Sequence, residues 1–196
     1  EGIVRIRLGS LEPRIITEEF ASELSKLKKI CPHFHLSLQS GCNATLKRMN
    51  RRYSAEEYYE KCRILRKYFD NPALTTDVIT GFPGETEEEF EESRRFVDKV
   101  DFYETHIFKY SKRRGTKAAE MKGQITEQEK AGRSAILQEM NERKQAEYEK
   151  QWVGKEVEVL FFFFSEKEGR KMVTGHTREY LRISVPCTED GEESWT

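Results

Sequence analysis

Three side chains of complementary chemistry lie close to the ends of apolar segments in the first half of the sequence. Gln39 follows one such segment, Arg51 lies a few residues further on, and Asp77 stands inside the next segment. A guanidinium pairs well with a carboxylate, an aspartate suits ribose hydroxyls, and Ile79 with Phe82 offers apolar surface for a flat ring. Together they would suit an amino-acid nucleoside, although Arg51 taken alone could equally be a solvated charge.

A glycine-containing loop follows Asp77. Gly81 and Gly84 interrupt the β-branched run 75–80, and a capping box at Thr86 predicts the start of a helix. A strand, a glycine loop and a helix in succession leave backbone N–H groups open to a ligand. An ordinary strand–turn–helix connection would explain this stretch as well.

The elements that must position these residues alternate between strand and helix, which predicts a parallel sheet with crossover helices. The predicted strands are 4–8, 34–38, 75–80 and 102–108, and the predicted helices are 17–29, 43–49, 54–69, 86–100 and 126–152. Ligands of such sheets bind at the carboxyl ends of the strands. We therefore expect Gln39, Arg51, Asp77 and the loop 81–84 to line one cavity.

One face of each predicted strand is polar. Parallel strands are normally apolar on both faces, yet Arg5, His35, Asp77, Glu104 and His106 alternate with apolar residues. Burying these groups unpaired in a dry core would be costly. A wet cavity on one side of the sheet resolves the conflict, whereas an antiparallel sheet would need hairpins that the intervening helices exclude.

The chain is too short for a closed eight-stranded barrel. It has 196 residues, and such a barrel needs about 250. Residues 1–125 therefore form either an open four-stranded sheet or the second half of a larger barrel, and the start at Glu1 without a methionine favours the second. The first and fourth strands would then be exposed edges, which predicts self-association.

The sequence pattern changes at residue 153, where the alternation of strands and helices ends. After the connecting helix 126–152, short strand-like runs at 155–164, 170–175 and 181–185 predict a small all-β module extending to residue 196. Four consecutive phenylalanines at 161–164 are expected to pack on both faces of one strand.

Charge balance, cysteine spacing and the lack of long apolar runs limit the kinds of partner, metal site and location that the sequence predicts. The 34 Lys and Arg nearly balance the 35 Asp and Glu, so net charge identifies no partner. The four cysteines lack metal-ligand spacing, which predicts no metal site of the chain's own and favours a reducing cytoplasm; Cys42 is interpreted as structural. No signal peptide or membrane-spanning run is visible.

Basic residues gather beside an aromatic side chain in the loop after the fourth predicted strand, and again in the β module. Such a combination suits a phosphate backbone with a base to be stacked, whereas a solvated surface would explain the charges without a partner. The residues expected to contact RNA are Lys109, Tyr110, Arg113, Arg114, Arg178 and Arg182. The β module should supply most of the affinity.

Several motifs occur together in a fixed order, at 35–41, 48–53, 77–85 and 110–116. They resemble the second half of the radical S-adenosylmethionine (SAM) barrel of methylthiotransferases. Gly175-His176-Thr177 with Tyr180-Leu181 resembles the small tRNA-binding β-barrel (TRAM domain) at the end of those enzymes. The resemblance covers nearly the whole chain.

The resemblance implies an α/β fold: half of a TIM-type radical SAM barrel with outer helices, followed by a truncated TRAM-like barrel. Gln39 and Arg51 would contact the methionyl part of SAM, and Asp77 its ribose, with Ser10 a weaker candidate. The other residues that it implicates are Ile79, Gly81 and Phe82 for the cofactor, and Ser111, Thr116 and His176 for tRNA.

One part of the family pattern is missing. The CxxxCxxC motif that binds the SAM-cleaving [4Fe-4S] cluster, and the ligands of the auxiliary cluster, would precede Glu1. We therefore assign no catalytic residue and expect the chain alone to be incapable of turnover.

The branch of the family is indicated by two short motifs. Residues 10–13 and 175–177 most resemble enzymes that add a methylthio group to C2 of N6-threonylcarbamoyladenosine at tRNA position 37. Branches acting on isopentenyladenosine or a ribosomal protein are alternatives. Two further hypotheses remain: the chain is a non-catalytic RNA-binding module, or it is a small nucleotide-binding domain.

Overall fold

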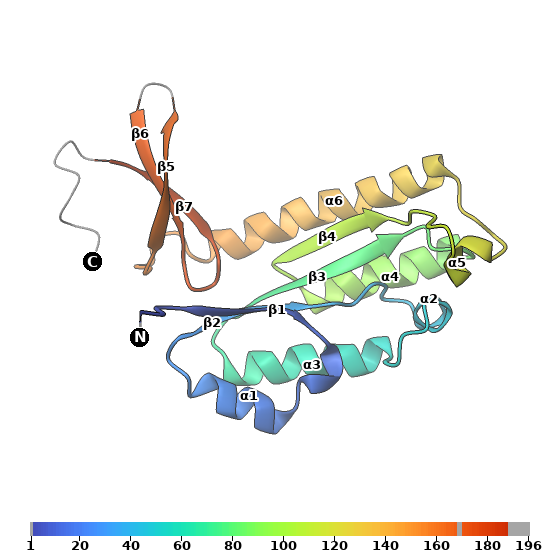
Figure 1. Ribbon diagram of the computed structural model, residues 1–196, viewed down its shortest axis with the longest axis horizontal. Coiled ribbons are helices and arrows are strands. Elements are labelled where there is room, and N and C mark those ends of the chain that lie inside the picture. Colours follow the sequence, from blue (N-terminus) through green and yellow to red (C-terminus); the bar gives the residue numbers. More distant parts are fainter. Residues whose placement is uncertain (1, 168–169, 188–196) are drawn as a thin grey trace.

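The computed structural model describes residues 2–167 and 170–187. Four strands form one parallel sheet in the order β1-β2-β3-β4 (Figure 1). They are β1 (Ile6–Leu11), β2 (Ile30–Leu36), β3 (Ala73–Thr80) and β4 (Glu104–Lys109). The predicted parallel α/β sheet is confirmed, while the half-barrel stays a prediction.

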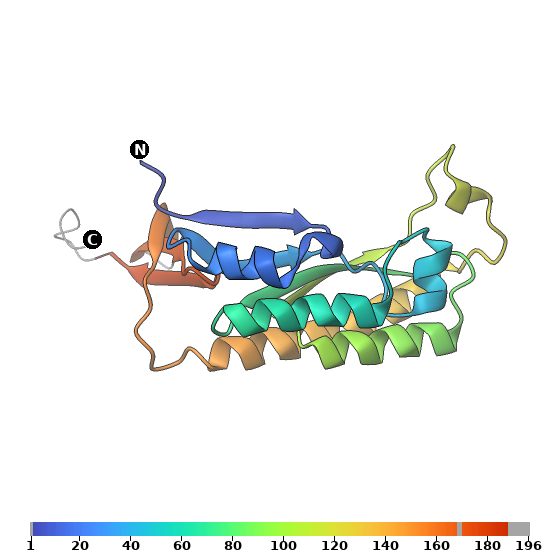
Figure 2. The same cartoon turned by 90° about the horizontal axis from the view of Figure 1, so that it is seen from below.

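The longer helices lie on one side of this sheet. The helices are α1 (Glu18–Ser25), α2 (Asn43–Arg48), α3 (Ala55–Tyr68), α4 (Glu87–Val100), α5 (Lys117–Glu120) and α6 (Glu127–Lys150), with a 3₁₀ turn η1 (Pro13–Ile15). Figure 2 shows α1, α3, α4 and α6 together below the strands. The sequence did not predict η1 or α5. Within the described part of the chain, no helix is long and apolar enough to cross a membrane.

Local capping explains where the helices begin. Ser54, Thr86 and Thr126 each form the predicted capping box. The hydroxyl accepts a hydrogen bond from the backbone N–H of the glutamate three residues later, and the carboxylate of that glutamate accepts one from the backbone N–H of the capping residue. The first helix ends at Ser25, before the predicted residue 29, because β2 already begins at Ile30. Leu27 therefore lies after the helix and is 56% exposed.

The core lies between the sheet and these helices. Leu36, Leu74 and Val78 are at most 1% exposed and meet the equally buried Leu65 and Leu137 from α3 and α6. Each such side chain contributes about 1.5–3 kcal/mol on burial. The apolar side of the predicted alternation is therefore the side that the helices cover.

The two edges of the sheet are β1 and β4. The edge of β4 is partly occupied by α6, since the Thr105 N–H donates to Asn141 Oδ1 at 2.6 Å. Self-association through these edges stays a prediction.

A second sheet follows α6. Its antiparallel strands are β5 (Leu160–Lys167), β6 (Arg170–His176) and β7 (Arg182–Pro186), in the order β5-β6-β7. The expectation for the phenylalanines was wrong: Phe162, Phe163 and Phe164 are 59%, 51% and 70% exposed. Within the described residues this sheet has no second layer to cover them. The TRAM-like barrel stays a prediction, and residues 188–196 lie outside the described part.

The second sheet lies beside the amino ends of the first-sheet strands (Figure 1). Arginine side chains connect the two sheets. Arg178 Nη2 donates to the carbonyl oxygens of Lys28 and Ile30, at 2.6 and 2.7 Å. Arg5 donates to the His176 carbonyl at 2.8 Å. The guanidinium of Arg178 thus has a docking role that competes with its predicted contact to tRNA.

Replacing Arg178 by alanine should loosen this contact. Hydrogen bonds from a charged group are worth about 1.5–3 kcal/mol, so the amides near Ile30 and in β6 should exchange faster in Arg178→Ala. Hydrogen–deuterium exchange measures this. The exposed Arg182 lies in the same module, and Arg182→Ala is the control. Equal exchange in both variants would show that Arg178 does not hold the module.

Candidate functional site

The face of the sheet that the helices leave uncovered carries a polar hollow of about 440 Å³. The strand pattern thus predicted correctly that polar residues line a hollow on one side of the sheet. Its lining residues are Arg7, Gly9, Ser10, His33, His35, Thr75, Asp77, Glu104, His106 and Tyr180.

Asp77 belongs to a compact group in this hollow. Its Oδ2 lies 3.2 Å from His35 Nε2, and His35 Nδ1 lies 3.0 Å from Thr75 Oγ1. His106 is the register partner of Asp77 on β4, and its ring centroid lies 5.5 Å from that of His35. One ring nitrogen of His35, one of His106 and a carboxylate oxygen of Asp77 all lie within 4.8 Å of one another, and each of these atoms could bind a metal ion. Sequence reasoning placed these residues on the polar face but did not group them, because grouping depends on register.

Two candidate cofactor residues have left-handed backbone conformations. Ser10 has φ 51° and Gln39 has φ 73°. Such conformations cost about 1–3 kcal/mol and persist where the surroundings impose them. For Gln39, the N–H donates to the Asp77 carbonyl at 2.8 Å and the C=O accepts from the Ile79 N–H at 2.9 Å. This bridge sets Gln39 beside the carboxyl end of β3.

Arg51 lines a different hollow, of about 430 Å³. The other lining residues are Ser10, Leu11, Glu12, Pro13, Arg14, Ser37, Asn50, Arg52 and Tyr53. Arg51 and Asp77 therefore line two hollows that share Ser10, and Gln39 and the loop 81–84 line neither of them, whereas the sequence predicted one cavity for all of these residues. The hydroxyl of Tyr53 donates to the carbonyl oxygens of Ser37 and Leu38, each at 2.9 Å. This contact fixes the backbone that follows β2.

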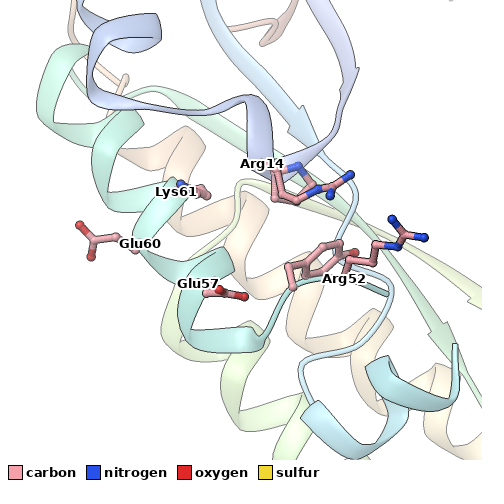
Figure 3. Close-up of a pocket in the computed structure, with 7 residues that line it drawn as sticks. Arg14, Arg52, Glu57, Glu60 and Lys61 are labelled. Carbon is pink, nitrogen blue, oxygen red and sulfur yellow. The ribbon is translucent and has the colours of Figure 1, made fainter. Parts of the chain in front are cut away.

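A third hollow, of about 330 Å³, adjoins the second between η1 and the start of α3 (Figure 3). In Figure 3 the side chains of Arg14 and Arg52 point to the same side. Arg14 Nε lies 2.6 Å from Glu12 Oε1. An anionic group approaching Arg51 would meet two further guanidinium groups nearby.

The glycine loop after β3 is held by a buried ion pair. Gly81 has φ 69°, and its N–H donates to Glu85 Oε2 at 2.7 Å. Arg133 Nη1, from α6, lies 2.9 Å from the same oxygen, and the two side chains are 8% and 2% exposed. A Cβ at Gly81 would collide with Lys130, so a larger residue does not fit. Sequence reasoning missed Glu85 and Arg133, which are 48 residues apart.

The predicted basic loop lies next to the glycine loop. The Phe82 and Tyr110 rings meet edge to face at 5.3 Å, and Lys130 Nζ lies 5.4 Å from the Tyr110 ring. A hollow of about 460 Å³ is lined by Lys109, Tyr110, Ser111, Lys112, Gln124, Ile125, Glu127 and Lys130. Outside it, Arg113, Arg114 and Thr116 of the same loop are also exposed.

The candidate RNA residues of the second sheet lie apart from this loop. His176 stacks on Tyr180 with centroids 4.0 Å apart, and burial lowers its pKa below the usual value. Arg178 is engaged with backbone carbonyls, and Arg182 is exposed. The structure thus brings the loop residues together but separates them from the module.

The cysteines do not form a cluster site in the described residues. Cys31, Cys42 and Cys62 are buried and Cys187 is half-buried, all as free thiols. The Cys42 thiol donates to Glu92 Oε2 at 3.3 Å, and burial raises its pKa. No three of them gather among those residues, so the chain described here does not fit a [4Fe-4S] cluster.

Removing the charge of Arg133 should destabilise the protein. Arg133→Met leaves the Glu85 carboxylate buried without its partner, which typically costs about 3–5 kcal/mol. Urea unfolding at about pH 7 measures the loss. Arg143→Met on the same helix removes only exposed ion pairs and should change stability little. Equal losses in the two variants would contradict the importance of the buried pair.

The loss in Arg133→Met should also depend on pH. Burial raises the pKa of Glu85, and the Gly81 N–H and Arg133 oppose this rise. Without Arg133 the pKa rises further, so the folded variant takes up a proton more readily than the unfolded chain. Its deficit should therefore shrink as the pH falls from about 7 to about 5. A deficit that is unchanged with pH would show that Glu85 is not its source.

Comparison with known proteins identifies relatives of the chain. Residues 2–97 match the Radical SAM superfamily. Over 191 residues the chain is 40% identical to "Threonylcarbamoyladenosine tRNA methylthiotransferase MtaB" of Bacillus subtilis, covering 97% of this chain and 42% of the relative. It is also 40% identical over 195 residues to a "tRNA-2-methylthio-N(6)-dimethylallyladenosine synthase" of Alkaliphilus oremlandii, covering 99% and 40%. The chain thus spans about two fifths of these relatives.

Two solved structures share the fold. Coproporphyrinogen III oxidase (HemN) of Escherichia coli, a radical SAM enzyme, matches with TM-score 0.60 and 17% identity, over 71% of this chain and 32% of that one. Archaeal Elp3 of Methanocaldococcus infernus matches with TM-score 0.53 and 13% identity, over 89% and 53%. The resemblance to radical SAM methylthiotransferases is confirmed by the family match and the relatives, while the half-barrel and the TRAM domain stay predictions.

Proposed function

Since this chain is a radical SAM homologue of the tRNA methylthiotransferases, we propose that it forms the part of such an enzyme that binds SAM and tRNA. The two hollows that share Ser10 are the observation that carries this proposal. An amino-acid nucleoside has two chemically different ends, and each hollow offers groups that suit one of them.

The residues of the site fit SAM in their chemistry. Asp77 presents a carboxylate, 27% exposed, that would accept hydrogen bonds from the ribose hydroxyls. Arg51 and Gln39 would hold the methionyl end, with Ser10 between the two. The glycine loop would complete the site through Ile79, Gly81 and Phe82. The radical chemistry of the family is supplied by SAM and its cluster; the work of these residues is binding and orientation.

For the substrate we propose N6-threonylcarbamoyladenosine at position 37 of tRNA, with a methylthio group added at C2. Sequence identity does not distinguish the two branches, because the relatives described above, one from each branch, are both 40% identical to this chain. The polarity of the open face favours this substrate. Arg7, His33, His35 and His106 line the hollow beside Asp77, and they suit a carboxylate-bearing substituent better than an apolar dimethylallyl group.

The tRNA would approach along the exposed basic groups. Lys109 is exposed at the end of β4, Arg113 and Arg114 are exposed in the loop that follows, and Arg182 is exposed in the second sheet. Four free cysteines accord with a cytoplasmic location.

Asp77→Asn should weaken SAM binding. A hydrogen bond to a charged group is worth about 1.5–3 kcal/mol, which corresponds to about 10-fold or more in the dissociation constant. Isothermal titration of SAM into the purified protein measures it. Asp70→Asn, in the turn before β3, is the control and should bind as the parent does. If Asp77→Asn binds SAM as tightly as Asp70→Asn, the assignment of the ribose subsite is wrong.

Replacing both Arg113 and Arg114 by alanine should weaken tRNA binding and its dependence on salt. Each lost phosphate contact lowers the slope of log affinity against log salt by about 0.7–0.9. Filter binding across salt concentrations measures this, with Arg182→Ala testing the second sheet and Arg143→Ala on α6 as the control. A larger effect in Arg182→Ala would favour the module as the main tRNA surface. Unchanged slopes in both would refute the proposed surfaces but leave the SAM site standing.

A further inference from the structure

We propose that His35, Asp77 and His106 form a binding site for a first-row divalent transition-metal ion on the open face of the sheet. The three residues come from the adjacent strands β2, β3 and β4. Their ligand-type atoms lie within 4.8 Å of one another at the polar hollow. An ion there would tie the three strands together on the side that no helix covers.

The spacing suits a shared ion. Nitrogen and oxygen ligands bind such ions at about 2.0–2.2 Å, which places two ligands of one ion roughly 3–4 Å apart. His35 Nε2 and Asp77 Oδ2 are already 3.2 Å apart. His106 is the direct register partner of Asp77, and its side chain is 43% exposed, so its ring has room to turn.

A hydrogen bond to Thr75 orients the ring of His35. Metal-binding histidines commonly hold their other ring nitrogen through a hydrogen bond. His35 Nδ1 lies 3.0 Å from Thr75 Oγ1, and Thr75 is 1% exposed within β3. This contact directs Nε2 of the same ring towards Asp77. On the other side, His106 Nδ1 lies 3.9 Å from Glu104 Oε1.

The donor set indicates the class of ion. Two imidazoles and one carboxylate suit first-row divalent ions such as Zn²⁺, Fe²⁺ or Co²⁺, whereas Mg²⁺ and Ca²⁺ prefer oxygen ligands. Three protein ligands leave further coordination positions that face the hollow. A histidine–aspartate hydrogen bond without an ion is the competing interpretation, and it predicts no affinity for metal.

This site shares His35, Asp77 and His106 with the pocket proposed for SAM and the substrate, but metal binding can occur whether or not that function is correct. The Oδ2 atom of Asp77 faces His35, which leaves Oδ1 available to a ribose hydroxyl. Metal binding is tested without SAM or tRNA, so failure of either proposal is visible separately.

The test is a titration of the reduced, chelator-treated protein with Co²⁺, followed by visible absorption. We expect one equivalent to bind with nitrogen and oxygen ligands, and therefore without the thiolate-to-cobalt band that binding at Cys187 would produce. His35→Ala and His106→Ala should each weaken binding at least about 10-fold. Thr75→Val should weaken it about 10-fold, because the ring of His35 loses the hydrogen bond that orients it. His176→Gln removes a histidine outside the group and should bind as the parent does.

Circular dichroism of the metal-free variants controls for folding, and the exposure of His106 makes His106→Ala the variant least able to disturb the core. The proposal is overturned if the parent protein shows no saturable Co²⁺ binding. It is also overturned if His106→Ala, folded, binds Co²⁺ with the affinity of the parent or of His176→Gln.

Discussion

The structure depends on one constraint: helices cover only one face of its parallel sheet. A parallel strand buried on both sides would be apolar throughout, but here the uncovered face carries His35, Asp77 and His106 while the covered face carries Leu36 and Val78. The hydrophobic effect therefore stabilises one side of the sheet and leaves the other free for chemistry. Polar groups can remain hydrated there, which is why the hollow exists.

The carboxyl ends of the strands are held more firmly than helix packing alone would achieve. Thr76 Oγ1 donates to the Leu36 carbonyl at 2.6 Å and accepts from the Leu38 N–H at 3.1 Å, joining the end of β2 to β3. The Glu85–Arg133 pair fixes the next loop from α6. Left-handed residues such as Gln39 persist because these contacts leave them few alternatives.

Charge has two distinct uses in this chain. In the second sheet and at the start of β1, Arg178, Arg5 and Arg7 contact carbonyl groups and an aromatic ring at the joint between the two sheets. In the loop after β4, Arg113 and Arg114 are exposed. Sequence alone presents all five as similar basic residues, but only those without internal partners suit a phosphate backbone.

The sequence by itself determined the order of strands and helices, the starts of α3, α4 and α6, and the polar side of the sheet, because capping boxes and strand alternation act between residues close in the chain. Only the tertiary structure decided which polar residues meet. Strand register brings His106 opposite Asp77, a left-handed Ser10 stands between the hollows of Asp77 and Arg51, and Arg178 reaches a carbonyl 148 residues away. Such contacts depend on packing of the whole chain, and no local pattern encodes them.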